Sequence, residues 1–311
     1  MTQSLETPVT LLVFNRPELT ARVFAEIRRA RPERLLIVAD GPRADRPGEA
    51  ERCARVRQIA TTVDWPCRVD THFAAENLGC RRRVSTGLDW VFEQVDRAII
   101  LEDDCVPEPS FFEYCQTLLD RYADDTRVMH VAGSCFLPEL ARRPESYVVS
   151  RFPFIWGWAT WRRAWQHFDV EMSHWPEFLA SGSLNRLFPD PADATIWERN
   201  LAATFRGDVD TWDAQWVLAF WLAGGLSLVS TRNLISNQGF GHDATHTVGW
   251  SPQAALPTLA QTEPIVHPTT LIVDPMLDAR FQQSVFRPRR SMFERVRRQL
   301  GRLTTAAGLG R

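Results

Sequence analysis

The sequence predicts an α/β fold with a mostly parallel sheet flanked by helices. Two observations predict it. Over the first 140 residues, short apolar runs of strand-forming residues alternate with helical segments. The composition also allows a large core, because 44% of the 311 residues are hydrophobic and 24% are charged. Sheets of this kind bind ligands outside the carboxyl ends of their strands, so a site is expected there.

Four strands are expected in this half, and three helices separate them. The first strand is a continuous apolar run, and the third is the weakest of the four. In the first helix Leu19, Val23 and Ile27 share one face, which is typical of a helix packed on a sheet. The expected strands are residues 9–14, 34–39, 68–73 and 97–101, and the expected helices are residues 17–30, 47–60 and 77–95.

The second half of the chain has a different character. It is rich in tryptophan, has longer irregular stretches and shows no βαβ rhythm. No low-complexity linker separates the halves, so a change of subdomain within one unit is expected near residue 140. The predicted organisation is an α/β half at residues 1–140, a tryptophan-rich half of the same unit at residues 141–285, and a basic tail at residues 286–311.

Composition excludes several classes of protein. All 36 basic residues are arginine, whereas a P-loop, a protein kinase and a pyridoxal enzyme each need a lysine. The net charge of −2 gives no sign of a nucleic-acid partner. A dehydrogenase would need a G-x-G-x-x-G segment after the first strand, and none is present there.

Cysteine spacing and hydropathy bear on the compartment. The six cysteines form no C-x-x-C pair and no secretory signal precedes them, so reduced thiols in a cytoplasmic protein are expected. The apolar run 217–229 is shorter than the ~20 residues of a membrane-spanning helix.

Residues 286–302 carry seven arginines and one glutamate. That tail fits either a solvated helix or peripheral docking on an anionic membrane.

The strongest local pattern is the triplet Glu102, Asp103 and Asp104 at the end of the fourth strand. Adjacent carboxylates repel each other, so a cation is expected nearby. Mg²⁺ and Mn²⁺ prefer carboxylate, phosphate and water oxygens, and either ion would neutralise a departing nucleoside diphosphate. The alternative is an acidic turn at the surface.

This triplet, with the Phe-Phe-Glu-Tyr run 111–114 after it, resembles the D-x-D region of GT-A glycosyltransferases. It is especially similar to the N-acetylglucosaminyltransferase I group. The resemblance implies a GT-A, Rossmann-like fold and an enzyme that transfers a hexose or an N-acetylhexosamine. It also implies that Asp104 binds the metal, while Glu102 and Asp103 contact the donor sugar and the ribose.

The same resemblance implies further contacts to the nucleotide. Residues 15–16 and Asp40 would hold the nucleoside, with Asp40 accepting from the base. Residues 77–83 look like the N-x-G segment of family 2 enzymes, where a basic residue faces the diphosphate. The alternatives are an N-cap for Asn15 and a turn residue for Asp40. The residues so assigned are Asn15, Arg16, Asp40, Arg81 and Arg83.

The run 152–161 resembles the acceptor loop of the same group, and tryptophan faces pack well against sugars. Most tryptophans here are expected in the core, with Trp156 and Trp158 as the acceptor-binding exceptions.

Asp213 resembles the general base of that group, although Ala214 and Gln215 interrupt the W-D-D-W pattern. Trp212 and Trp216 would desolvate Asp213 and raise its pKa. The alternative is helix capping by Asp210 and Asp213.

Residues 237–247 look like a G-x-G-x-D-x-T-H-T run of bacterial members, which implies that His246 reaches the metal or diphosphate, with His242 as second choice.

Taken together, these motifs lead us to expect metal-dependent, inverting transfer from a UDP-sugar to a glycan, lipid-linked or other hydroxyl acceptor. Two alternatives are a nucleotidyltransferase of related fold and a non-catalytic sugar-binding scaffold. Against the first, residues 14–17 replace the lysine-bearing phosphate loop.

Overall fold

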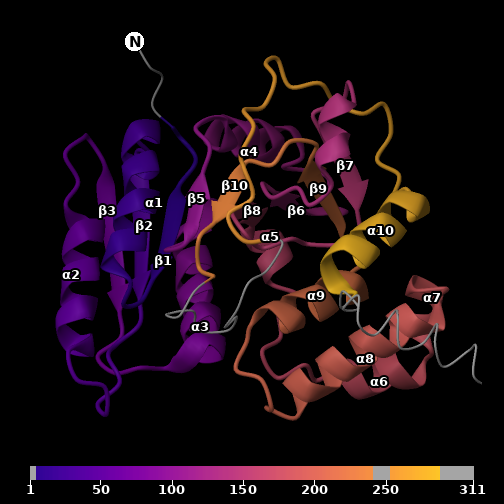
Figure 1. Ribbon diagram of the computed structural model, residues 1–311, viewed down its shortest axis with the longest axis horizontal. Helices are drawn as coiled ribbons and strands as arrows, with labels where there is room; N and C mark the ends of the chain where they lie inside the picture. Colours follow the sequence, from indigo (N-terminus) through magenta and orange to yellow (C-terminus); the bar gives the residue numbers. More distant parts are fainter. Residues whose placement is uncertain (1–4, 241–252, 288–311) are drawn as a thin grey trace, which may run out of the picture.

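The computed structural model describes residues 5–240 and 253–287, and its centre is an eight-stranded sheet (Figure 1). β7 and β8 run opposite to the other six strands, so the sheet is mostly parallel and the predicted fold class is confirmed. The strands lie in the order β3 (Arg68–Phe73), β2 (Arg34–Ala39), β1 (Val9–Val13), β4 (Arg97–Glu102), β8 (Trp158–Trp161), β6 (Val128–Ala132), β9 (Leu226–Ser230) and β7 (Tyr147–Ser150). A separate antiparallel ribbon pairs β5 (Cys105–Pro107) with β10 (Ile235–Asn237).

The two faces of the sheet pack against different helices because successive side chains of a strand point to opposite faces. Leu11 of β1 packs in one apolar cluster with α1, α2 and α4. Leu12, the next residue, lies in the other cluster with α3. Burial on both faces explains the continuous apolar runs of the inner strands. These helices are α1 (Pro17–Ala30), α2 (Glu49–Thr61), α3 (Gly79–Gln94) and α4 (Ser110–Arg121).

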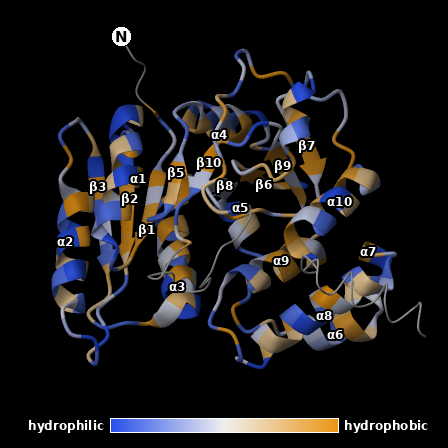
Figure 2. Ribbon diagram, in the orientation of Figure 1, coloured by the Kyte–Doolittle hydropathy of each residue, from blue (hydrophilic) through white to orange (hydrophobic). Residues whose placement is uncertain are grey.

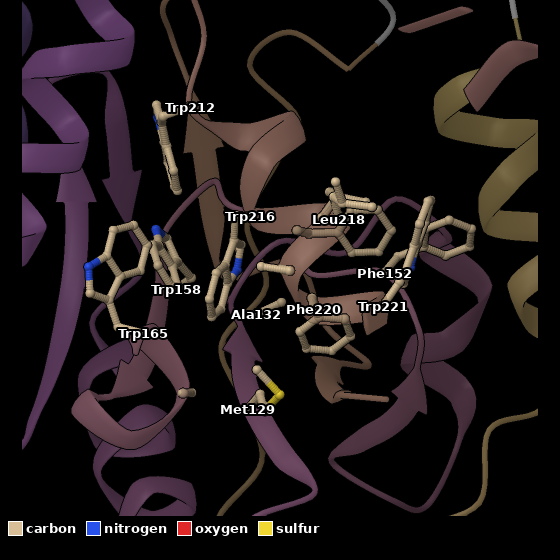
Figure 3. Packing of buried hydrophobic residues seen from close by; sticks show 14 of the residues in the cluster. Met129, Ala132, Phe152, Trp158, Trp165, Trp212, Trp216, Leu218, Phe220 and Trp221 are labelled. Carbon is tan, nitrogen blue, oxygen red and sulfur yellow. The ribbon is translucent and has the colours of Figure 1, made fainter. Parts of the chain in front are cut away.

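Five tryptophans of the second half lie together in the core beside β6, β8 and α9, namely Trp158, Trp165, Trp212, Trp216 and Trp221 (Figure 3). Trp158 stacks on Trp212 with ring centroids 5.7 Å apart, and Trp216 packs against Trp165 at 5.4 Å. The helical elements of this half are η1 (Pro138–Arg142), α5 (Arg162–Trp165), α6 (Trp175–Ala180), α7 (Ser183–Leu187), α8 (Pro191–Phe205), α9 (Asp213–Leu222), α10 (Pro275–Phe281) and the π-helical turn η2 (Gln282–Phe286).

One sheet joins the two halves of the chain, because β4 of the first half pairs with β8 of the second over four residue pairs from Arg97 to Ile100. Figure 2 shows hydrophobic residues along the strands and hydrophilic ones on the outer helices, α2 most clearly. The six cysteines form no disulfide. Among the residues described, no helix combines the length and apolar character that crossing a membrane requires.

Candidate active site

A pocket of about 750 Å³ lies at the carboxyl ends of β1, β2 and β4, where the sequence places the site. Asn15, Arg81 and Trp158 are not part of its lining, and His242 and His246 lie outside the described residues. The predicted residues that the pocket does bring together are Arg16, Asp40, Arg83, Glu102, Asp103, Asp104, Trp156 and Asp213.

Arg16 is the cation that faces the carboxylate triplet. Its guanidinium pairs with Asp103 and also with Asp104, where Arg16 Nη1 lies 2.9 Å from Asp104 Oδ2. The backbone N–H of Phe14 donates a further bond of 3.2 Å to Asp103 Oδ2. Arg16 therefore ties the end of β1 to the end of β4, and its single positive charge offsets part of the negative charge of these two carboxylates.

Glu102 is the third carboxylate of the triplet and lies half-buried on the pocket wall. Its pKa is raised to about 8, first by burial and then by the neighbouring charges of Asp104 and Asp103. The triplet thus holds more negative charge than Arg16 compensates. Among the described residues no group of three His, Cys, Asp or Glu side chains is arranged as a complete metal site.

Asp40 at the end of β2 is buried and organises the loop that follows β3. Its Oδ1 accepts from the N–H groups of Gly41 at 2.8 Å and Leu78 at 2.9 Å, and its Oδ2 accepts from Asn77 Nδ2 at 2.9 Å. Burial nevertheless raises the pKa of Asp40, because desolvation of the carboxylate outweighs these hydrogen bonds.

Asn15 does not cap α1, because the N-cap is Arg16 and no side chain caps it. The amide of Asn15 instead donates a bond of 2.8 Å to Glu49, whose side chain is fully buried. Glu49 also binds Arg43 through the backbone N–H at 2.7 Å and the guanidinium at 2.5 Å. Contact with Arg43 lowers the pKa of Glu49 to about 2.

Arg43 and Glu49 were not predicted as site residues. Arg43 lines the pocket, with its guanidinium carbon 5.4 Å from the ring centroid of Phe14. The only signal in the sequence is that Arg43 follows the end of the second strand within a Gly41-Pro42 turn. Glu49 falls within the helix expected at residues 47–60, and nothing in the sequence of that segment indicates a buried glutamate.

Of the arginines in the 81–83 run, the structure directs only Arg83 to the pocket. Arg81 points elsewhere and donates to the carbonyl of Val170 at 2.5 Å. Arg83 is 5% exposed, binds His72 Nδ1 at 2.8 Å, and has its pKa lowered by burial. The buried positive charge of Arg83 interacts with the carboxylate of Asp40, so both side chains are held in place in the wall of the pocket.

The acceptor-side prediction for Trp158 is wrong. Trp158 is fully buried, stacks on His130 at 4.9 Å between ring centroids, and has no surface to offer a ligand. Trp156, on the other side of Gly157, does line the pocket and contacts Phe240 edge to face. Trp158 begins β8 and points into the core, whereas Trp156 lies before the strand, and Gly157 between them has a left-handed backbone with φ of 60° that redirects the chain.

Asp213 is the first residue of α9 and lines the pocket. Its Oδ1 accepts from Thr211 Oγ1 at 2.5 Å and from the N–H of Ala214 at 2.7 Å. Oδ2 has no hydrogen-bond donor among the described residues. Asp213 therefore presents one fixed carboxylate whose second oxygen is available to a ligand.

Comparison with known proteins finds no matching family model and no matching curated sequence. Solved structures with partial similarity include a cytidylyltransferase from Leptospira borgpetersenii serovar Hardjo-bovis, with TM-score 0.33, 8% identity, and coverage of 57% of this chain and 68% of that one. A UDP-glucose pyrophosphorylase complexed with UDP-glucose has a TM-score of 0.26 and 10% identity, and the match covers 47% of this chain and 62% of that one. Mouse xyloside xylosyltransferase 1 in its apo form has a TM-score of 0.32 and 12% identity, and the match covers 69% of this chain and 81% of that one. These neighbours are nucleotidyl- and glycosyltransferases, and the function of this chain is inferred from its own pocket residues.

Proposed function

We propose that the chain is a metal-dependent glycosyltransferase that moves a sugar from a UDP-sugar to a hydroxyl group of an acceptor. One observation carries the proposal. A single pocket of about 750 Å³ is lined by Asp40 and Asn77 on the nucleotide side, by the carboxylate triplet, and by Asp213 with Trp156. A donor nucleotide, its diphosphate and an acceptor need those three groups in one continuous space.

The carboxylate triplet fits a hard divalent cation, Mn²⁺ or Mg²⁺. Such ions are commonly held by one or two carboxylates together with phosphate oxygens and water, so a complete protein cage is not required. Asp104 would bind the ion, and Glu102, which lines the same pocket, would offer a second oxygen ligand. When bound, the ion would act as a Lewis acid that stabilises the charge of the departing diphosphate. Arg16, which already contacts Asp103 and Asp104, keeps the pair oriented.

Asp213 is the proposed general base. Thr211 and the N–H of Ala214 hold Oδ1, so Oδ2 is the atom that would take the proton of the acceptor hydroxyl. A base on the acceptor side supports direct displacement with inversion at the sugar. The indole of Trp156 gives the acceptor an apolar face, which suits the C–H side of a sugar.

Thermal unfolding of the full chain with nucleoside diphosphates, with and without MnCl₂, tests the donor site. A ligand that binds only the folded state raises stability by about RT ln(1 + [L]/Kd). We expect a Mn²⁺-dependent stabilisation that Asp104→Ala abolishes. Glu177→Ala, which removes an exposed carboxylate on α6, is the matched control and should respond like the wild type.

Transfer is tested by release of UDP from UDP-sugars in the presence of a panel of acceptors. Asp213→Asn should keep the Mn²⁺-dependent stabilisation and lose transfer. Release of pyrophosphate from a nucleoside triphosphate would favour the nucleotidyltransferase alternative. If no nucleotide changes the unfolding temperature, the donor site does not exist and the proposal fails.

A further inference from the structure

One side of the pocket is a row of aromatic rings that begins beside the carboxylate triplet. A Cβ on Gly239 would lie 2.0 Å from Asp104 Oδ2, and the next residue is the first ring of the row. The aromatic row consists of Phe240, Trp156, Phe136, Phe154 and Phe286, all of which line the pocket. Centroids of successive rings are 5.5, 5.3, 5.0 and 6.2 Å apart. A ligand that extends from the carboxylates along this side therefore meets one ring after another.

Most of the aromatic row has surface to offer a ligand. Phe154 is 6% exposed and backs the row, whereas the other four rings are only partly buried. Val209, which is 41% exposed, and the partly buried Ile155 add aliphatic surface to the same pocket. Apolar side chains that remain accessible inside a pocket favour a ligand with an apolar part.

The far end of the aromatic row is fixed by polar contacts. Phe286 belongs to η2 and packs on Trp197 of α8, with ring centroids 4.6 Å apart. Trp197 Nε1 donates to Gln282 Oε1 at 2.9 Å. Arg287 Nη2 donates to Asp193 Oδ2 at 2.8 Å. These bonds hold η2 against α8, so this end of the pocket has a defined shape.

Apolar surface also continues from the proposed base. Val217 follows Asp213 by four residues on α9, so the two side chains share one face of the helix, one turn apart. Both line the pocket, as does Ala214. A hydroxyl group at Asp213 thus places the group attached to it against apolar side chains.

Polar side chains in this part of the described lining bond to the protein itself. Thr204 Oγ1 donates to the carbonyl of Asn200 in its own helix at 3.1 Å. Gln253 Nε2 donates to the carbonyl of Ser284 at 3.1 Å. An oligosaccharide has several hydroxyl groups on each ring, and they would lose bonds to water here without replacement. A hydrocarbon chain has no such cost and gains free energy by leaving water.

We infer that the acceptor is amphipathic, a hydroxyl compound whose hydrocarbon chain lies along the aromatic row. The inference rests on the proposed function and deepens it, because it names the class of acceptor. The hydroxyl oxygen bonds to the anomeric carbon of the sugar as the bond to the diphosphate breaks, and Asp213 takes the proton. The chain then extends past Trp156 towards Phe286 and contributes binding energy away from the reacting atoms.

The test is calorimetric titration of the full chain, in UDP and MnCl₂, with n-octyl β-D-glucoside below its micellar concentration and with methyl β-D-glucoside. The two probes share their sugar and differ only in the length of the alkyl chain, so the ratio of their affinities isolates the chain. We expect the octyl compound to bind the wild type at least about tenfold more tightly.

Two variants locate the chain. Val209→Asp puts a charge into the pocket lining at an exposed position, so the fold should survive while the ratio falls towards one. Phe136→Ala removes a ring from the middle of the row and should lower the ratio at least about threefold. Leu222→Asp is the matched control, because Leu222 is 46% exposed, ends α9 and does not line the pocket. It should keep the wild-type ratio.

Equal binding of the two glucosides to the wild type, or a ratio that neither pocket variant lowers, would overturn the inference. A fall in Leu222→Asp as large as that in Val209→Asp would also overturn it, because the chain would then bind elsewhere on the surface. Titration with UDP alone in MnCl₂ separates these failures from failure of the proposed function. If UDP binds, the donor site stands without this acceptor class, and if UDP does not bind, the proposed function fails and the aromatic row is not part of an acceptor site.

Discussion

The carboxylate of Asp210 accepts a hydrogen bond of 2.9 Å from the backbone N–H of Cys80, 130 residues earlier in the chain. The other oxygen of Asp210 accepts from the N–H of Arg81 at the same distance. The loop before α9 thus caps the first turn of α3, which has no cap from its own N-cap residue. The capping of α9 by Asp210 that the sequence suggested is not observed, because Asp210 serves a different helix.

Asp210→Ala should destabilise the fold, because two N–H groups of α3 lose their partner and a negative charge is lost from the helix N-terminus. The expected loss in the free energy of unfolding is about 1 kcal/mol, measured by urea denaturation. Asp208→Ala removes an exposed carboxylate of the same loop that pairs with Arg206, and should cost less. Equal losses in the two variants would argue against the cap.

The positions of the first four strands along the chain and the triplet at the end of β4 were accessible from sequence because they depend on local patterns. Buried parallel strands have continuous apolar runs, and β1, β2 and β4 fall within one residue of the predicted bounds. The antiparallel β8 between β4 and β6 was not predicted. Its Trp158–Trp161 segment has the same composition as an aromatic loop, and only pairing with β4 and β6 makes it a strand.

The site is harder to predict where side chains act across long distances in sequence. The Arg16 contacts to Asp103 and Asp104 join two strand ends that the α/β pattern already brings together. No local pattern shows that Glu49 is buried under Arg43, or that Asp210 reaches α3. Those contacts follow from packing between elements, and periodicity contains no information about them.

Thr211→Val should impair the proposed base without altering donor binding. Loss of the 2.5 Å bond from Thr211 Oγ1 frees the Asp213 carboxylate to rotate away from the geometry that presents Oδ2 to the acceptor. We expect kcat to fall about tenfold while the affinity for UDP in MnCl₂ stays at the wild-type value. Thr211→Ser restores the donor and should recover kcat. Equal kcat values for the two variants would show that Thr211 does not position Asp213.

Gly239→Ala should disturb the carboxylate site from the opposite wall. A Cβ at this position would lie 2.0 Å from Asp104 Oδ2 and 3.2 Å from Arg16 Nη1, so both side chains must move. Because these are side-chain ends, the fold should survive while the Mn²⁺-dependent affinity for UDP falls at least about tenfold. Titration with UDP measures this, and Gln238→Ala, outside the pocket lining, is the control. Unchanged affinity would place the metal away from Asp104.

His130 should make the stability of the fold sensitive to acid. Burial lowers the pKa of His130 to about 3. Its neutral ring donates from Nε2 to the carbonyl of Phe154 at 2.9 Å and accepts from Trp216 Nε1 at 3.3 Å. The unfolded chain binds a proton near pH 6.5 and the folded chain does not, so stability is lost as pH falls from about 6.5 towards 3.

Between pH 7 and 5 this histidine alone should lower the free energy of unfolding by roughly 2 kcal/mol. The His130→Gln variant has no titrating group at this position. Its free energy of unfolding, measured by urea denaturation, should therefore fall between pH 7 and 5 by roughly 2 kcal/mol less than that of the wild type. His174→Gln removes an exposed histidine and should follow the wild type. If His130→Gln keeps the wild-type dependence on pH, the acid sensitivity comes from other groups, and the buried ring of His130 is not held neutral.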